Sequence, residues 1–287
     1  MIKDLNRYLV REGEPLNLDN FSTLAQEGLE KKTTEKEVIP ANIAEMQEWQ
    51  AKLYSEDKTG ILIVLQAMDA AGKDGVIKHV MSGLNPQGTV VSAFKQPTLE
   101  ELDHDYLWRI HSKVPGKGSI GIFNRSHYED VLVTRVHNLI DDCRLPGEYA
   151  SDIWTRRYMQ IRNYEQYLTE NSIHVIKFFL HISKEEQKQR LLSRIENENK
   201  NWKFSRADIE ERKHWEEYRF AYEQMIMATS TEHCPWYVIP SDQKWFSRYL
   251  VSEILLVKFR EINPEYPELD EKEKAALNEW KEVLLKS

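Results

Sequence analysis

A stretch of small residues ending in a lysine has the composition of a phosphate-binding loop. The apolar run Ile61–Leu65 indicates a strand buried on both faces. The small residues of Ala67–Gly72 follow, and Lys73 then precedes a helical pattern. This order is typical of a P-loop, in which backbone N–H groups and a helix N-terminus hold phosphate while the lysine reaches the outer oxygens.

The loop departs from the common P-loop pattern G-x-x-x-x-G-K-[ST] at two positions. Ala67 stands where the first glycine belongs, and Asp74 replaces the Ser or Thr that normally contacts Mg²⁺. Asp69 lies inside the loop, where a carboxylate is compatible with bound phosphate if a metal ion lies between them. The alternative interpretation is an ordinary buried strand followed by a turn with a solvated lysine.

A second polar group follows the predicted strand 119–124. In P-loop enzymes, the strand beside the P-loop strand commonly ends in a carboxylate that reaches the metal. Here that position is Asn124, and Arg125 comes next. Asp130 lies about one helical turn further on, so we expect it to face the same cleft. Alternatively, Glu129 and Asp130 are helix N-terminal acids that complement the helix dipole.

Basic residues occur in a segment that has the pattern of a lid. A predicted helix from Ser183 carries Arg190 and Arg194, and a polar loop with Lys203 leads into a further helix over 206–227. Lids close over phosphates and supply positive charge. A solvated charged helix face is the alternative. Lys95, after the strand predicted at 89–94, is another phosphate candidate or else a surface lysine.

The elements that must position these residues alternate between buried strands and helices, which predicts an α/β fold with a parallel sheet. We expect an N-terminal arm and helix over 1–54, a P-loop kinase domain over 55–262 with its lid at about 183–205, and a C-terminal helical extension over 263–287. The helices are expected at 42–54, 76–81, 99–111, 131–136, 153–168, 183–195, 206–227, 241–260 and 272–285, and the five strands at 61–65, 89–94, 119–124, 173–180 and 236–240.

Composition limits the kind of partner. The 287 residues carry a net charge of −8, which argues against nucleic-acid binding over the whole surface. No stretch approaches the apolar length of a membrane span, and no signal peptide precedes the charged N-terminal sequence. Cys143 and Cys234 fit neither a metal spacing nor a disulfide framework. We therefore expect a cytoplasmic protein with reduced thiols and no membrane contact.

Taken together, the segments from about Asn42 to Phe259 resemble the family-2 polyphosphate kinases. The resemblance implies a three-layer P-loop kinase fold similar to thymidylate kinase, with a central parallel five-stranded sheet and a helical lid. It also implies phosphoryl transfer between inorganic polyphosphate and nucleotides, with Mg²⁺ or Mn²⁺. The segments that carry it are Met68–Gly75, Ile120–Val131, Phe179–Gln187 and Asn201–Ser205.

The resemblance also implies roles for individual residues. Asp69 and Asp130 are the better metal candidates, because Asn124 stands where relatives that mainly interconvert nucleoside di- and triphosphates have Asp. Asn124, His127, Glu129 and Asp130 together resemble the subclass that acts on nucleoside monophosphates as well as diphosphates. The expected catalytic residues are Asp69, Lys73, Arg125 and Asp130; the phosphate-binding residues Ala70, Ala71, Gly72, Lys73, Asp74, Gly75, Lys95, Arg190, Arg194 and Lys203; and the nucleotide-binding residues Asn124, His127, Glu129 and Arg135.

Two other functions remain open at this point. An ATP-dependent nucleoside monophosphate kinase would share the fold but take ATP as its donor. A non-catalytic phosphate-binding or regulatory protein would keep the loop without turnover, although the acids and bases of both motifs argue against it. We expect a homo-oligomer, either a dimer or a tetramer.

Overall fold

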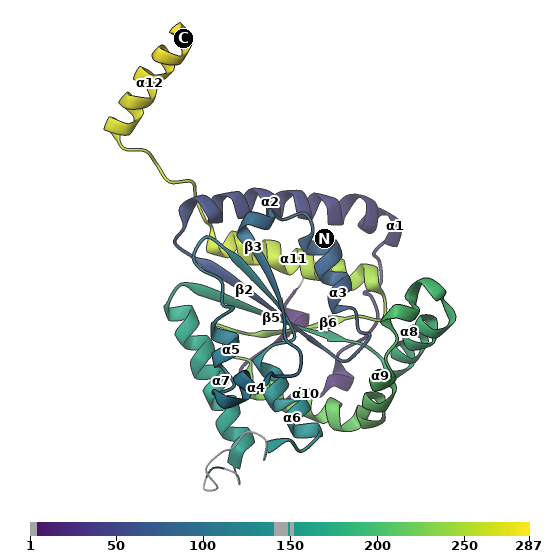
Figure 1. Cartoon of the computed structure of the whole chain (residues 1–287). Helices are drawn as coiled ribbons and strands as arrows, with labels where there is room; N and C mark the ends of the chain where they lie inside the picture. The colour runs from purple at the N-terminus through teal and green to yellow at the C-terminus, as the bar shows by residue number, and fades with distance from the viewer. Residues whose placement is uncertain (1–4, 141–148, 150–151) are drawn as a thin grey trace.

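The structure, a computed structural model, describes residues 5–140, 149 and 152–287. The described residues form one six-stranded sheet with the strand order β1-β6-β5-β2-β4-β3 (Figure 1). Five strands run parallel, whereas β1 pairs antiparallel with β6. The strands are β1 Leu9–Val10, β2 Gly60–Ala67, β3 Thr89–Ala93, β4 Ile120–Asn124, β5 Ile173–His181 and β6 Trp236–Pro240.

Strand β2 is the centre of the sheet, and all of its residues are buried. Its neighbours are β4, with Ile61 opposite Ile120, and β5, with Gly60 opposite Ile173. Apolar side chains are needed on both faces of a parallel strand because helices cover both. The five parallel strands confirm the predicted core of the sheet, and the short β1 at its edge is an addition that sequence patterning did not predict.

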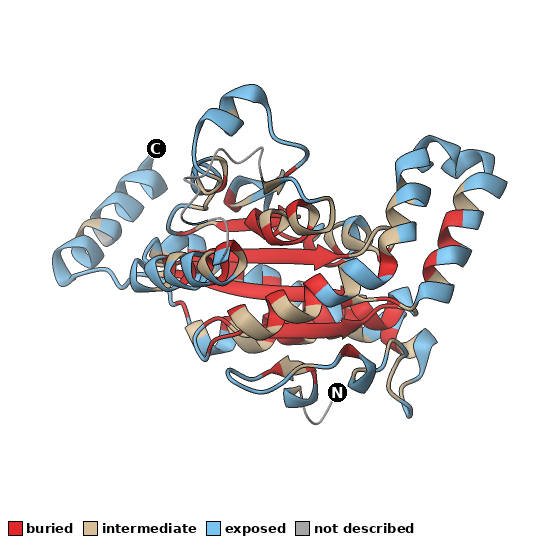
Figure 2. Ribbon diagram, turned by 90° about the horizontal axis from the view of Figure 1, so that it is seen from below, coloured by how far each residue is buried: buried red, intermediate tan, exposed pale blue. Residues whose placement is uncertain are grey.

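Two layers of helices cover the sheet (Figure 1). Ile61, Ile63 and Leu65 pack on one face with α2 and α11, while Leu62 and Val64 pack on the other with α7 and α10. Figure 2 shows the buried strands between the two layers. The helices are α1 Lys31–Thr33, α2 Ile39–Glu56, α3 Lys73–Val76, α4 Leu99–Asp103, α5 Trp108–His111, α6 Val133–Val136, α7 Ile153–Glu170, α8 Lys184–Glu196, α9 Arg206–Glu211, α10 Trp215–Thr229, α11 Lys244–Ile262 and α12 Glu271–Lys286.

Some predicted helices are divided in the structure. The helix expected over 99–111 is instead α4 and α5, because the Asp105 carboxylate accepts the Leu107 N–H at 2.9 Å and so competes with helical hydrogen bonding. The helix expected over 206–227 is divided into α9 and α10 by a 3-10 turn at Arg212–His214. The helix at 131–136 begins as a 3-10 helix, His127–Val131, which precedes α6.

The two ends of the chain behave differently. The N-terminal arm returns to the sheet through β1, and the Leu18 N–H donates to the Glu223 carboxylate on α10 at 2.9 Å. Helix α12 stands away from the domain (Figure 1), with Trp280 and Leu284 exposed. Cys234 is a buried free thiol. Cys143 lies outside the described residues.

Candidate active site

The P-loop connects the end of β2 to α3 through two left-handed residues. Ala70 has φ +62° and Gly72 has φ +115°. Such a conformation is unfavourable for alanine, and strained residues of this kind concentrate at ligand sites. The loop reverses the chain tightly, and it places Lys73 at the first position of α3.

Lys73 is the cation of this loop. Its Nζ donates to the Ala67 carbonyl at 2.7 Å, so the side chain folds back over the loop that precedes it. Burial, together with the nearby Arg125 guanidinium, lowers the pKa of Lys73 to about 8, although Asp69 and Glu129 oppose this effect. An approaching phosphate favours the protonated form of Lys73, because its negative charge compensates for the hydration that the ammonium group loses on burial.

Arg125 joins the turn after β4 to the P-loop. Its φ is +64°, and in this left-handed conformation its Nη2 lies 2.7 Å from Asp69 Oδ1. Its Nη1 lies 3.3 Å from Glu129 Oε2. Beside it, Asn124 Nδ2 donates to Asp74 Oδ1 at 2.9 Å. Two side-chain contacts therefore connect the end of β4 with the phosphate loop.

Arg190 of α8 supports the back of the P-loop. Its Nη1 donates to the carbonyls of Ala70 and Ala71 at 3.0 and 2.7 Å, and its Nη2 donates to those of Ser241 and Asp242 at 2.5 and 3.1 Å. The side chain is buried. Arg190 was expected to bind phosphate as part of a mobile lid, but here its guanidinium holds the loop carbonyls in place.

Helix α10 forms an aromatic wall beside the Asp69–Arg125 pair. Trp215, Tyr218 and Tyr222, spaced by three and four residues, line one pocket together with Asp69, Arg125 and Arg212. Arg212 Nη1 donates to Gln187 Oε1 at 2.7 Å, and Gln187 Nε2 donates to the Asp69 carbonyl at 3.0 Å. The pocket therefore combines the charges of the P-loop edge with flat apolar side chains, which suits a ligand that has both anionic and aromatic parts.

Comparison with known proteins identifies the class to which this arrangement belongs. The family model for polyphosphate kinase 2 matches residues 28–267. The chain belongs to the polyphosphate kinase 2 family. Membership agrees with the three-layer α/β fold and with the P-loop geometry described above.

Relatives match this family member along most of its length. An ADP-polyphosphate phosphotransferase of Rhodopseudomonas palustris is 42% identical, with 98% of both chains covered. An AMP/ADP-polyphosphate phosphotransferase of Meiothermus ruber is 48% identical, with 78% of this chain and 80% of that protein covered. The crystal structure of polyphosphate kinase 2 from Arthrobacter aurescens superimposes with a TM-score of 0.85 at 38% identity, covering 96% of this chain and 97% of that one.

Within this polyphosphate kinase 2 chain, four of the expected residues point elsewhere. His127 is buried, and its Nε2 lies 3.7 Å from Glu165 Oε1. The Arg135 guanidinium donates to Tyr158 Oη at 2.9 Å, and Arg194 pairs with Asp208 at 2.5 Å. Lys203 lies exposed over the Trp202 ring. All four of these partners lie outside the P-loop.

Asp130 was expected in the same cleft as Asp69, but its contact lies on the other side of the turn. Its Oδ1 lies 3.8 Å from Arg157 Nη1. Burial raises the pKa of Asp130 to about 6, although Arg157 lowers it. The reason is the 3-10 geometry of His127–Val131, which directs Glu129 rather than Asp130 toward Arg125.

Lys95 is exposed just after β3, where its carbonyl accepts a hydrogen bond from Arg109.

Few carboxylates are available at this loop to hold a divalent metal ion. Among the described residues, no group of three or more His, Cys, Asp or Glu side chains has the arrangement of a metal site. Asp69 and Asp74 nevertheless flank Lys73, and both act on its pKa. Mg²⁺ usually keeps several waters and takes one or two carboxylates together with substrate phosphates. The acids of this loop therefore fit Mg²⁺, whereas no contact brings Asp69 and Asp130 together.

Sequence reasoning missed the residues contributed by the α8–α10 region. Gln187 belongs to a segment that resembles the family, but its amide carried no assignment. The signal for the aromatic wall was present, since positions 215, 218 and 222 fall on one helix face. Arg212 could not be predicted from spacing, because its role depends on the 3-10 turn that separates α9 from α10.

Proposed function

We propose that this family member transfers phosphoryl groups between inorganic polyphosphate and nucleotides at the carboxyl edge of the sheet. The observation that supports this site best is the convergence of Lys73, Arg125 and Asp69 beside a pocket with an aromatic wall. As a polyphosphate kinase 2, the chain is a polyphosphate–nucleotide phosphotransferase. The comparisons do not favour an ATP-dependent nucleoside monophosphate kinase or a non-catalytic phosphate-binding protein.

Both substrates are anions, so the main barrier is to bring them together and to stabilise charge on the transferred group. In our proposal, Lys73 and the loop N–H groups hold the phosphate at the point of transfer. Arg125 neutralises charge on the transferred phosphoryl group, and Asp69 orients the guanidinium. The nucleotide phosphate is already ionised, so no strong general base is required. Asp69 and Asp74 would hold Mg²⁺ or Mn²⁺, which would supply additional positive charge beside the phosphoryl oxygens.

The aromatic pocket suggests where the nucleotide lies. Tyr218, the partly exposed ring of this wall, offers a face on which a base can stack, while Arg125 and Arg212 line the same pocket and would face its phosphates. We propose that nucleoside monophosphates and diphosphates are both acceptors, giving diphosphates and triphosphates reversibly. The name of the Meiothermus ruber relative, which is 48% identical, supports this choice.

One experiment tests the proposed reaction directly. Purified protein is incubated with AMP or ADP, Mg²⁺ and polyphosphate, and the nucleotides are separated by chromatography. We expect ADP and ATP to form from AMP, and ATP to form from ADP. A parallel reaction with ATP and AMP but no polyphosphate tests the rival kinase, which would produce ADP at a similar or higher rate.

We further propose a homo-oligomer, either a dimer or a tetramer, and the division of the chain at residues 54 and 262. The exposed apolar side chains of α12 support an intermolecular contact, because a helix of this length is marginal in water without packing. Light scattering coupled to size-exclusion chromatography measures the oligomer directly. Within the described residues, no helix has the length and apolar character that crossing a membrane requires.

A further inference from the structure

A buried ion pair lies beneath the turn that carries Arg125. Glu165 of α7 and Lys177 of β5 place Oε2 and Nζ 2.6 Å apart, and their side chains are 1% and 0% exposed. Burying two charges costs about as much as their attraction returns, and well-packed apolar residues often replace such a pair without loss of stability. Stability alone therefore explains the pair poorly, and a positioning role is the better explanation.

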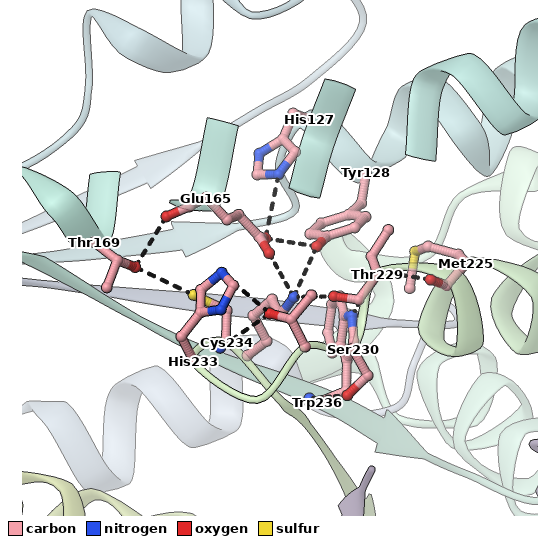
Figure 3. Close-up of polar contacts among 12 residues, drawn as sticks. His127, Tyr128, Glu165, Thr169, Met225, Thr229, Ser230, His233, Cys234 and Trp236 are labelled. Atoms are coloured by element: carbon pink, nitrogen blue, oxygen red, sulfur yellow. Dashed lines mark hydrogen bonds and ion pairs between the residues drawn. The ribbon is translucent and has the colours of Figure 1, made fainter. Parts of the chain in front are cut away.

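Tyr128, three residues after Arg125, contacts Glu165 of this pair (Figure 3). Its Oη donates to Glu165 Oε1 at 2.6 Å and accepts from Lys177 Nζ at 3.2 Å. Lys177 also donates to the carbonyl of Thr229, the last residue of α10, at 2.7 Å. The same ammonium group thus anchors both the turn after β4 and the helix that carries the aromatic wall.

The turn itself needs such an anchor. Arg125 has φ +64°, a conformation that costs about 1 kcal/mol or more for a residue with a side chain. Ser126 Oγ accepts the Tyr128 N–H at 3.3 Å and the Gln66 amide at 3.1 Å, which fixes the backbone between them. Glu165 and Lys177 hold Tyr128 Oη. Tyr128, which follows Arg125 in the turn, is therefore fixed both at its backbone N–H and at its side chain.

We propose that Tyr128, held by the Glu165–Lys177 pair, is a positioning residue that keeps Arg125 in the geometry needed for phosphoryl transfer. Tyr128 is buried, so it acts through the turn rather than on a substrate. This inference rests on the proposed role of Arg125. It adds the reason why a lysine, a glutamate and a tyrosine are buried together behind the site.

The variant Tyr128→Phe removes the hydroxyl group and keeps the ring. Tyr237→Phe is the matched control, because Tyr237 of β6 is also buried but packs in the hydrophobic cluster on the opposite face of the sheet. We expect kcat to fall by about tenfold in Tyr128→Phe, with little change in KM for polyphosphate, because a small misplacement of a catalytic group suffices for such a loss. The control should keep kcat within about twofold, and thermal melts of both variants separate a loss of rate from a loss of stability.

A double-mutant cycle with Arg125→Lys tests whether Tyr128 acts through Arg125. We expect Tyr128→Phe to lower kcat much less in the Arg125→Lys background than in the wild type, because the two residues would act as one unit. Equal factors in both backgrounds would overturn the proposal, and so would a normal rate in Tyr128→Phe. If Arg125→Lys and Arg125→Ala both keep the wild-type rate, the proposed site is wrong as well, and the two failures are thereby distinguished.

Discussion

At the scale of single residues, the site depends on how four charged groups share a small volume. Arg125 lies between Asp69 and Glu129, and the charges of all three side chains affect the pKa of Lys73. The sequence predicted that Asp69, Lys73 and Arg125 act together. It did not predict the contact between Asp69 and Arg125, because that contact depends on the left-handed backbone at Arg125, which residue types do not reveal.

Removing the loop cation should affect catalysis more than folding. We expect Lys73→Ala to lower kcat by about 10²–10³-fold, the usual effect of losing one preorganised electrostatic contact. The substitution removes a buried charge, so the thermal midpoint should not fall. Steady-state kinetics with polyphosphate and ADP, together with a thermal melt, measure both effects. A folded Lys73→Ala protein with wild-type kcat would show that this lysine does not hold the reacting phosphate.

The pKa of Lys73, lowered to about 8, predicts a pH dependence. Below this value the side chain is protonated and attracts phosphate. As the pH rises through about 8 the free enzyme loses this charge, so kcat/KM for polyphosphate should fall. The measurement is kcat/KM between pH 6 and 9.5 at constant ionic strength.

The residual activity of Lys73→Ala serves as the control for this pH profile. It should lack the decline above pH 8, since no lysine remains to titrate at this position. The same decline in the variant would assign the titration to another group.

At the scale of elements, α8 is both part of the expected lid and a support for the P-loop. Its inner half is fixed to the body by Gln187 and Arg190, so any closing motion must begin beyond Arg190. In Figure 2 the outer part of this region is exposed and extends beyond the buried core. This interpretation places the mobile part of the lid over residues 192–205.

The support by Arg190 can be tested through stability. Arg190→Met keeps the length of the side chain but leaves four carbonyl acceptors without their donor. We expect the free energy of unfolding in urea to fall by about 2–5 kcal/mol, the range for unsatisfied buried groups. Arg194→Met on the same helix is the control, since its single partly exposed ion pair with Asp208 is worth about 1 kcal/mol or less. Equal losses in both variants would argue against a special role for Arg190.

Long apolar runs made most elements predictable, whereas short elements depend on contacts that a sequence pattern does not contain. The parallel strands were predicted because a strand covered on both faces must be apolar throughout, as β2 is. Strand β1 has two residues, too few for any periodicity. The division into α4 and α5 depends on the carboxylate of Asp105, and that into α9 and α10 on a 3-10 turn.

At the scale of the whole molecule, α12 and the segment before it are separate from the core. The exposed side chains of α12 include Leu277, Trp280 and Leu284. A protein shortened by residues 271–287 should therefore keep its kcat per chain, and in dilute solution, where copies do not associate, it should keep its thermal midpoint within about 2 °C, because little area buried on the body is lost. Differential scanning calorimetry and kinetics at matched concentration provide the measurement. A large drop in the midpoint that depends on protein concentration would show instead that α12 contributes through another copy.

The pairing of β1 with β6 has a consequence for how the chain is made. Leu9 lies opposite Tyr237, so β1 is synthesised long before the strand with which it pairs. Until β6 is synthesised, one edge of β5 exposes unpaired backbone N–H and C=O groups between apolar side chains. Such an edge is a template for association with other chains. Chaperone demand during synthesis should therefore be greatest just before residue 236 emerges. An interrupted chain that stops there should aggregate, even though it already contains the whole P-loop.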